Sequence, residues 1–134
     1  MPRKVLKPAS LDFQPRPTYP YSPGAMGGGM VYTAGQVAWD ASGALVGGND
    51  LQAQARQCLA NLKAVLASQG ATPADLVRIR TYVVNHTPDM LGPVSEELMA
   101  FYGDAVPAPN TWISVPGLAL PDFLIEIEGT AVLR

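Results

Sequence analysis

Cysteine, histidine, basic residues and long apolar runs are all scarce in this chain, and each scarcity excludes a class of protein. Among 134 residues there is one cysteine and one histidine, so neither an internal disulfide nor a histidine-rich metal site is available. Nine Lys and Arg against eleven Asp and Glu give a net charge of -2, and no Lys or Arg lies between Arg80 and Arg134. Nucleic-acid binding needs a basic stripe, so nucleic acid is a disfavoured partner.

Membrane and export signals are also missing. No stretch approaches eighteen consecutive apolar residues, and the opening MPRKVLKPASLDF lacks the apolar region of a signal peptide. We therefore expect a cytoplasmic protein without a membrane span. Charged residues make up only 15% of the chain, well below the usual quarter, which suggests that partner subunits hide part of the surface. The one basic cluster is interpreted as a solvated tail and comprises Arg3, Lys4, Lys7 and Arg16.

The length is that of a single domain over residues 1–134, and hydrophobic periodicity divides it into strands and two helices. Six prolines exclude a continuous helix from residues 1–24, and three consecutive glycines at 27–29 mark a hairpin turn between two short strands that begin at Ala25. The expected strands, from alternation and turn signals, lie at residues 30–39, 44–46, 76–84, 110–115 and 123–133.

Two helices are expected from apolar residues spaced three and four apart. The first follows Asn49 or Asp50, either of which can cap it, and ends before Gly70. The second starts at Pro88 and stops at Gly103. The order of elements predicts an α+β fold in which two helices cover one face of a sheet of about five or six strands.

Two helices shield only one side of such a sheet, so the other face must meet water or another subunit. Alternation predicts that Val77, Ile79, Thr81 and Val83 face the helices. The uncovered face is expected to carry Arg78, Arg80, Tyr82, Asn110, Trp112, Ser114, Glu126 and Glu128. Because this mixture suits an oligomer interior that contains polar sites, we expect an oligomer.

The two glutamates are the strongest catalytic candidates in the sequence. Glu126 and Glu128 lie two residues apart on one face, so their carboxylates are about 6.5 to 7 Å apart along the strand. Such a pair can act as acid and base. The alternative is that they form ion pairs with Arg78 and Arg80 across the sheet.

Other residues offer less chemistry. Cys58 falls on the apolar stripe of the first helix and is interpreted as a buried small hydrophobe, because no base is placed beside it. His86 lacks companions at metal-ligand spacing and is interpreted as a surface turn residue. The triple glycine at 27–29 lacks the Lys-Ser/Thr and the following helix of a phosphate loop.

Several segments of the chain form a recognisable set: the runs MVYTAGQV, GALVGGNDLQAQARQCLANLKAVL, VRIRTYVV, FYGD and LIEIEGTAV. Taken together, these runs resemble the reactive-intermediate deaminase family, also known as RidA, YjgF or L-PSP endoribonuclease. The resemblance covers the chain from about Tyr19 to the last residues. It implies a chorismate-mutase-like fold and a homotrimer with three small-molecule clefts between subunits. It also implies hydrolysis of enamines and imines derived from amino acids, without metal or cofactor.

The resemblance also implies residue roles. Tyr21 matches the tyrosine that closes the pocket, Gly35 the glycine whose backbone assists, and Glu126 the glutamate that positions the attacking water. The arginine that grips the substrate carboxylate does not carry over, because Asn110 occupies its position. Trp112 stands where relatives often have a small residue, so the pocket is expected to differ in shape.

The absence of the arginine is expected to weaken binding of the substrate carboxylate. An uncharged hydrogen bond in place of a charged one weakens carboxylate binding by about 1 to 2 kcal/mol, or about tenfold. Arg80 is the candidate replacement cation, with an ion pair to Glu126 or Glu128 as the alternative. Three functions follow in order of preference: an imine or enamine deaminase, a non-catalytic trimer that binds a small metabolite or regulates a partner, and an endoribonuclease.

Overall fold

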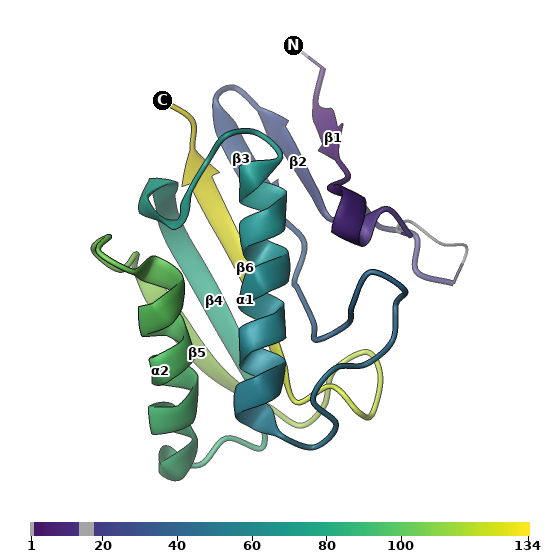
Figure 1. Cartoon of the computed structure of the whole chain (residues 1–134), viewed down its shortest axis with the longest axis vertical. Coiled ribbons are helices and arrows are strands. Elements are labelled where there is room, and N and C mark those ends of the chain that lie inside the picture. Colours follow the sequence, from purple (N-terminus) through teal and green to yellow (C-terminus); the bar gives the residue numbers. More distant parts are fainter. Residues whose placement is uncertain (1, 14–17) are drawn as a thin grey trace.

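A six-stranded sheet with two α-helices packed on one of its faces forms the fold. The computed structural model describes residues 2–13 and 18–134. The sheet order is β1-β2-β3-β6-β4-β5, and every neighbouring pair is antiparallel except β4 and β5. The strands are β1 (Lys4–Leu6), β2 (Gly24–Gly27), β3 (Met30–Thr33), β4 (Leu76–Val84), β5 (Asn110–Val115) and β6 (Ile125–Val132). The α+β prediction is confirmed (Figure 1).

The helices follow the expected local signals. Helix α1 spans Leu51–Ala67, and the Asp50 carboxylate caps it by accepting from the Ala53 backbone N–H at 3.1 Å. Helix α2 spans Leu91–Tyr102 and ends at Gly103, whose φ of 58° is in the left-handed region. Short 3-10 turns occupy Ala9–Leu11, Pro73–Asp75 and Pro88–Met90, so α2 begins three residues later than Pro88 predicted.

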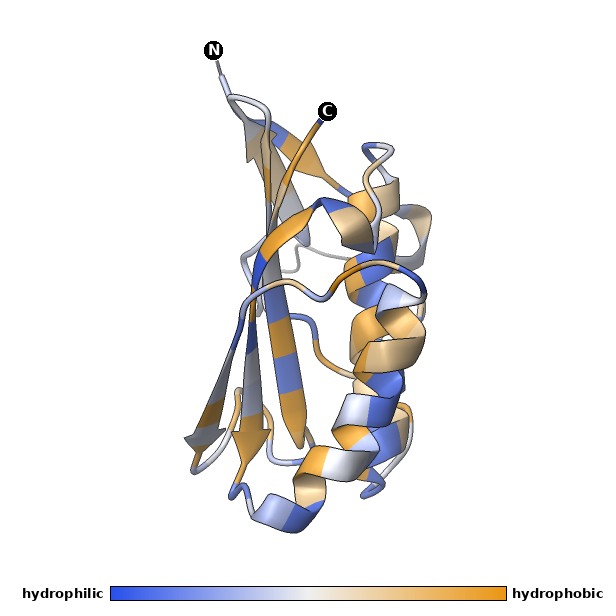
Figure 2. Ribbon diagram, turned by 90° about the vertical axis from the view of Figure 1, so that its left-hand side faces the viewer, coloured by the Kyte–Doolittle hydropathy of each residue, from blue (hydrophilic) through white to orange (hydrophobic). Residues whose placement is uncertain are grey.

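The core lies between the helices and the sheet, which Figure 2 shows edge-on. The fully buried core side chains include Val31, Leu62, Val65, Ile79, Val83, Ile125 and Ile127. They come from α1 and from the three central strands, so this layer fixes the position of β4 and β6. The opposite face of the sheet has no helix over it among the described residues, and it is called the open face below.

Four expectations about the strands were wrong. The strand expected over residues 30–39 ends at Thr33 and continues only as isolated bridges from Gln36 and Trp39. The strand expected at 44–46 is reduced to one bridge, Trp39 to Leu45. Val77 is 44% exposed because a register shift between Leu76 and Arg78 interrupts the alternation. The basic amino end was interpreted as a solvated tail, but Lys4 begins strand β1. Lys4 remains exposed. Arg16 lies outside the described residues.

The side assigned to β5 was also wrong. Asn110, Trp112 and Ser114 pair in register with Ile79, Thr81 and Val83, which face the helices. Thr111, Ile113 and Val115 therefore lie on the open face instead. The cause is that a parallel edge strand takes its side from its register with β4, which its own weak alternation does not reveal.

Candidate functional site

The open face carries the two glutamates together, as predicted. Along β6 and β4 the register sets Glu126 beside Tyr82, and Glu128 beside Arg80. The helix-facing neighbours Ile125 and Ile127 are fully buried, so the sheet is anchored directly beneath the carboxylates. The spacing of two residues on one strand thus brings both acids to the same surface.

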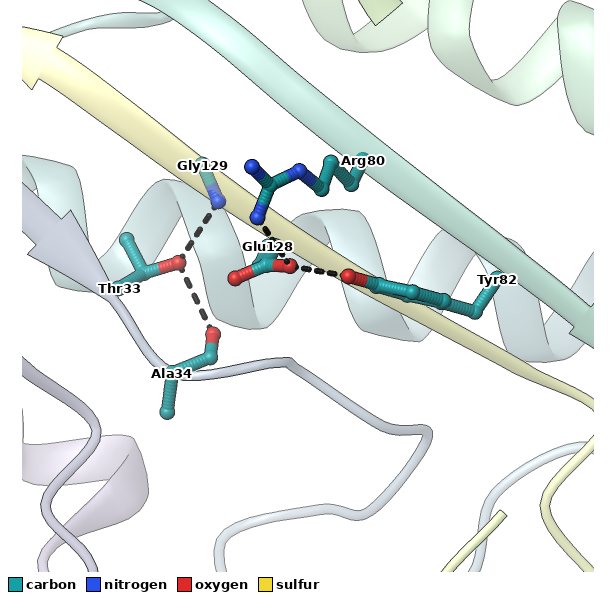
Figure 3. A network of polar contacts seen from close by, with 6 residues as sticks. All are labelled: Thr33, Ala34, Arg80, Tyr82, Glu128 and Gly129. Atoms are coloured by element: carbon teal, nitrogen blue, oxygen red, sulfur yellow. Dashed lines mark hydrogen bonds and ion pairs between the residues drawn. The ribbon is translucent and has the colours of Figure 1, made fainter. Parts of the chain in front are cut away.

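Glu128 is held by partners across the strands. Its Oε1 accepts a short hydrogen bond from the Tyr82 hydroxyl and lies 3.4 Å from a guanidinium nitrogen of Arg80 (Figure 3). The hydrogen bond to Glu128 raises the pKa of the Tyr82 phenol above its usual value. The ion-pair alternative is therefore realised for Glu128 with Arg80.

Glu126 has a different environment. Its carboxylate makes no hydrogen bond or ion pair within the described part of the chain. Burial, and to a smaller extent the negative charge of Glu128, raises the pKa of Glu126 above its usual value of 4.5. A carboxyl whose pKa moves toward neutrality can both accept and return a proton, which is what acid-base chemistry requires.

Gly35 lies directly against this carboxyl. A Cβ atom built on Gly35 would lie 2.6 Å from both Cδ and Oε2 of Glu126, so a side chain at position 35 would force the Glu126 side chain to move. Neither the N–H nor the C=O of Gly35 has a hydrogen-bonding partner among the described residues. A bare peptide group with an unused donor and acceptor therefore borders the Glu126 carboxyl.

Backbone and amide contacts hold the Gly35 segment in place. Gln36 exchanges two backbone hydrogen bonds with Ile127, at 2.8 and 3.0 Å, and the Ala34 N–H donates to Pro23 O at 2.8 Å. The buried Asn61 amide of α1 donates to the carbonyls of Val37 and Trp39, at 3.0 and 2.9 Å. The glycine is thus fixed on both sides against β6.

Sequence reasoning missed two buried amides of α1: Asn61, which holds the segment after Gly35, and Gln54, which holds the chain just before α1 and just before β6. Gln54 and Asn61 interrupt the apolar stripe of α1 at helical spacing, next to Cys58 and Val65. Gln54 donates to Gly48 O and Asp122 O, and its Oε1 accepts from the Leu124 N–H at 2.9 Å. Polar residues on an otherwise apolar helix face are the signal that identifies such positions.

The structure places the other candidates in two groups. Tyr21 is 39% exposed and lines a depression of about 390 Å³ together with Tyr32, Thr33 and Ala34, next to Gly35 in the chain. Asn110 and Trp112 lie on the helix side of the sheet, away from Glu126 of the same chain. The Thr81 hydroxyl donates to Asn110 Oδ1 at 3.1 Å, and the indole N–H of Trp112 donates to Nδ1 of His86 at 3.2 Å.

The remaining expectations concern Cys58 and His86, which the sequence analysis interpreted as residues without a catalytic role. Cys58 is fully buried, and burial raises the pKa of its thiol far above the usual value, as expected of a core residue. His86 is half-buried beside Trp112 and is therefore not a purely surface residue.

Among the described residues there is no group of three His, Cys, Asp or Glu side chains placed to hold a metal ion. None of the helices that the structure describes has the length and apolar character needed to span a membrane.

Comparison with known proteins identifies the family. The sequence profile of the endoribonuclease L-PSP family matches residues 12–133. The chain belongs to this family. A RutC family protein of Pyrococcus horikoshii is 30% identical over 118 residues, which cover 87% of this chain and 90% of that protein. The resemblance to the RidA/YjgF family is therefore confirmed.

Solved L-PSP family structures agree with the fold. A protein of unknown function of the conserved Rid family from Yersinia pestis is 51% identical, with a TM-score of 0.77 over 99% of this chain and 100% of that one. The structure of E. coli TdcF with bound serine is 25% identical, with a TM-score of 0.83 over 98% of this chain and 99% of that one. These similarities establish the family and the fold.

Proposed function

We propose that this chain is an imine or enamine deaminase in which Glu126 is the catalytic acid and base. The observation that carries the proposal is the half-buried Glu126 carboxyl, of raised pKa, set against the bare peptide of Gly35. Membership of the L-PSP family supports it, because the reactive-intermediate deaminases named above are proteins of that family. No cofactor enters the proposed reaction.

The proposed reaction needs one proton acceptor and one proton donor. Ionised Glu126 takes a proton from water while the water oxygen bonds to the imine carbon, and the protonated carboxyl gives that proton to nitrogen, which forms a carbinolamine. Glu126 then moves the proton of the carbinolamine hydroxyl to nitrogen while the carbon–nitrogen bond breaks, so the products are ammonia and a carbonyl compound. The unused N–H and C=O of Gly35 can hold the substrate beside the carboxyl, and Tyr21 can cover it.

A homotrimer with clefts between subunits is part of the proposal. The open face has no helix over it among the described residues and exposes Val132 by 41%, and this uncovered surface favours contact with another chain. Asn110 faces away from Glu126 within one chain, so a cleft that contains both needs Asn110 from a neighbouring chain. Light scattering should give three times the chain mass of 14.2 kDa. A monomer at micromolar concentration would refute the trimer and its clefts.

The test of the deaminase uses enamine formed in situ by a serine or threonine dehydratase, with keto-acid appearance as the readout. Glu126→Gln should lower the rate by about 10²- to 10⁴-fold, since it removes the proton carrier. Glu96→Gln, on the exposed side of α2, is the matched control and should leave the rate unchanged. If Glu126→Gln retains the wild-type rate while folded, Glu126 is not the catalytic group.

A non-catalytic binding trimer is the second candidate, and Asn110 favours it. The position where the resemblance expects a carboxylate-gripping arginine holds a neutral amide that is already bonded to Thr81. The TdcF structure contains serine, a small amino acid. Saturable serine binding by calorimetry, without any keto-acid formation, would favour this candidate. The endoribonuclease ranks last, because His86 is the sole histidine in the sequence and cannot form the acid-base pair of in-line cleavage.

A further inference from the structure

A second depression of about 230 Å³ lies on the open face, over β3, β6 and β4. Tyr32, Thr130 and Arg78 form one cross-strand row of its lining, because Thr130 pairs with both of the others in register. Arg80 and Glu128 form the adjacent row. Three strands therefore contribute side chains to one small polar pocket.

The bonding of the pocket leaves positive charge and hydrogen-bond donors unused. The Glu128 carboxylate is already engaged by Tyr82 and Arg80, as Figure 3 shows. Arg78 is exposed and has no ion pair or hydrogen bond within the described residues. Two guanidinium groups against one carboxylate give the pocket a charge of +1.

The floor of the pocket is already satisfied. The Thr33 hydroxyl donates to Ala34 O at 2.9 Å and accepts from the Gly129 N–H at 3.0 Å, and both contacts are drawn in Figure 3. The groups left to meet a ligand are therefore the Arg78 guanidinium and the hydroxyls of Tyr32 and Thr130. A guanidinium beside two hydroxyls is a set that suits an oxyanion.

We propose that this pocket binds a small oxyanion, a carboxylate or a phosphate, with Arg78 as its main ligand. Arg78 forms a forked contact with two oxygens of the anion, while Tyr32 and Thr130 each donate one hydrogen bond. The charge of Arg78 has no other use in the described structure.

The pocket is separate from the proposed catalytic carboxyl. Thr130 lies four residues along β6 from Glu126, a distance of about 13 Å at the usual rise of a strand. Glu126 is not among the residues that line the pocket, and Arg78, Thr130 and Tyr32 form the row of the lining that lies farther from it along the strands. Anion binding therefore stands whether or not the chain is a deaminase.

The experiment is a titration followed by amide and arginine Nε–H NMR signals of the protein as it exists in solution. Inorganic phosphate and malonate are the two probes, and sodium chloride at equal ionic strength is the control. Saturable shifts should appear at Arg78, Tyr32 and Thr130, with one anion bound per chain. The tighter probe identifies the ligand as phosphate-like or carboxylate-like.

Variants at Arg78 make the outcome decisive. Arg78→Gln should weaken binding of the tighter probe about tenfold or more, and Arg78→Lys should weaken it less, since it keeps the charge but loses the fork. Lys63→Gln removes one positive charge from α1 on the other side of the molecule and should change nothing. Equal shifts with chloride, unchanged affinity in Arg78→Gln, or shifts centred on Gly35 and Glu126 would each overturn the proposal.

Discussion

Replacing Gly35 by alanine tests the contact on which the candidate site rests. The new Cβ would lie 2.6 Å from Cδ and Oε2 of Glu126 and 2.8 Å from its Cγ. Carbon atoms at their optimal separation are about 3.5 to 4.0 Å apart, so the overlap is roughly 1 Å. Overpacking of this kind costs about 1 to 3 kcal/mol. Because the contacted atoms belong to a side chain that can rotate, we expect about 1 to 2 kcal/mol.

The expected loss is measurable by thermal unfolding. A chain of 134 residues has an unfolding entropy of about 0.28 kcal/mol per kelvin, so 1 to 2 kcal/mol lowers Tm by about 4 to 7 °C. Gly27→Ala is the matched control, because its Cβ would meet no atom within 4 Å. Both variants gain the same restriction of the unfolded chain, so their difference reports the clash alone.

A double-mutant cycle assigns the cost to Glu126. In a Glu126→Ala background the clash is absent, so Gly35→Ala should then cost no more than Gly27→Ala. The coupling free energy between Gly35 and Glu126 should be about 1 to 2 kcal/mol. If Gly35→Ala is as stable as its control and the coupling is zero, the carboxyl does not lie against Gly35 and the proposed site is wrong.

Three further predictions follow from the same groups. Glu128→Gln should lower the pKa of Glu126 in an NMR titration without bringing it to 4.5, because burial remains; an unchanged pKa would contradict the role of the Glu128 charge. Glu126→Gln should have a higher free energy of unfolding in urea than wild type at pH 7, because the ionised Glu126 carboxylate is destabilised by burial in the folded state. The difference should vanish below pH 4.5, where Glu126 is protonated in both the folded and the unfolded chain. A difference that stays constant at every pH would refute this. Cys58 should react with a thiol reagent only at the rate of unfolding, whereas rapid labelling of native protein would show that the thiol is accessible.

The elements that the sequence predicted correctly are those with strong local signals. Asp50, Gly70 and Gly103 mark helix ends by capping and backbone preferences, and both helices were found close to where they lie. The strand over 76–84 was found with its exact limits because its alternation is long. Alternation on β6 likewise placed Glu126 and Glu128 on the open face with Arg80 and Tyr82.

What the sequence alone determined was therefore the two helices, the strand over 76–84 and the side on which Glu126 and Glu128 lie, because these follow from periods of two and 3.6 and from backbone preferences. The role of Gly35 was implied only by the family resemblance. Tertiary structure decided the rest. The side that Asn110 takes on β5 depends on register with β4, the exposure of Val77 on a bulge, and the raised pKa of Glu126 on burial beneath a distant segment. Register, bulges and burial arise from contacts between residues far apart in the chain, and no local pattern encodes them.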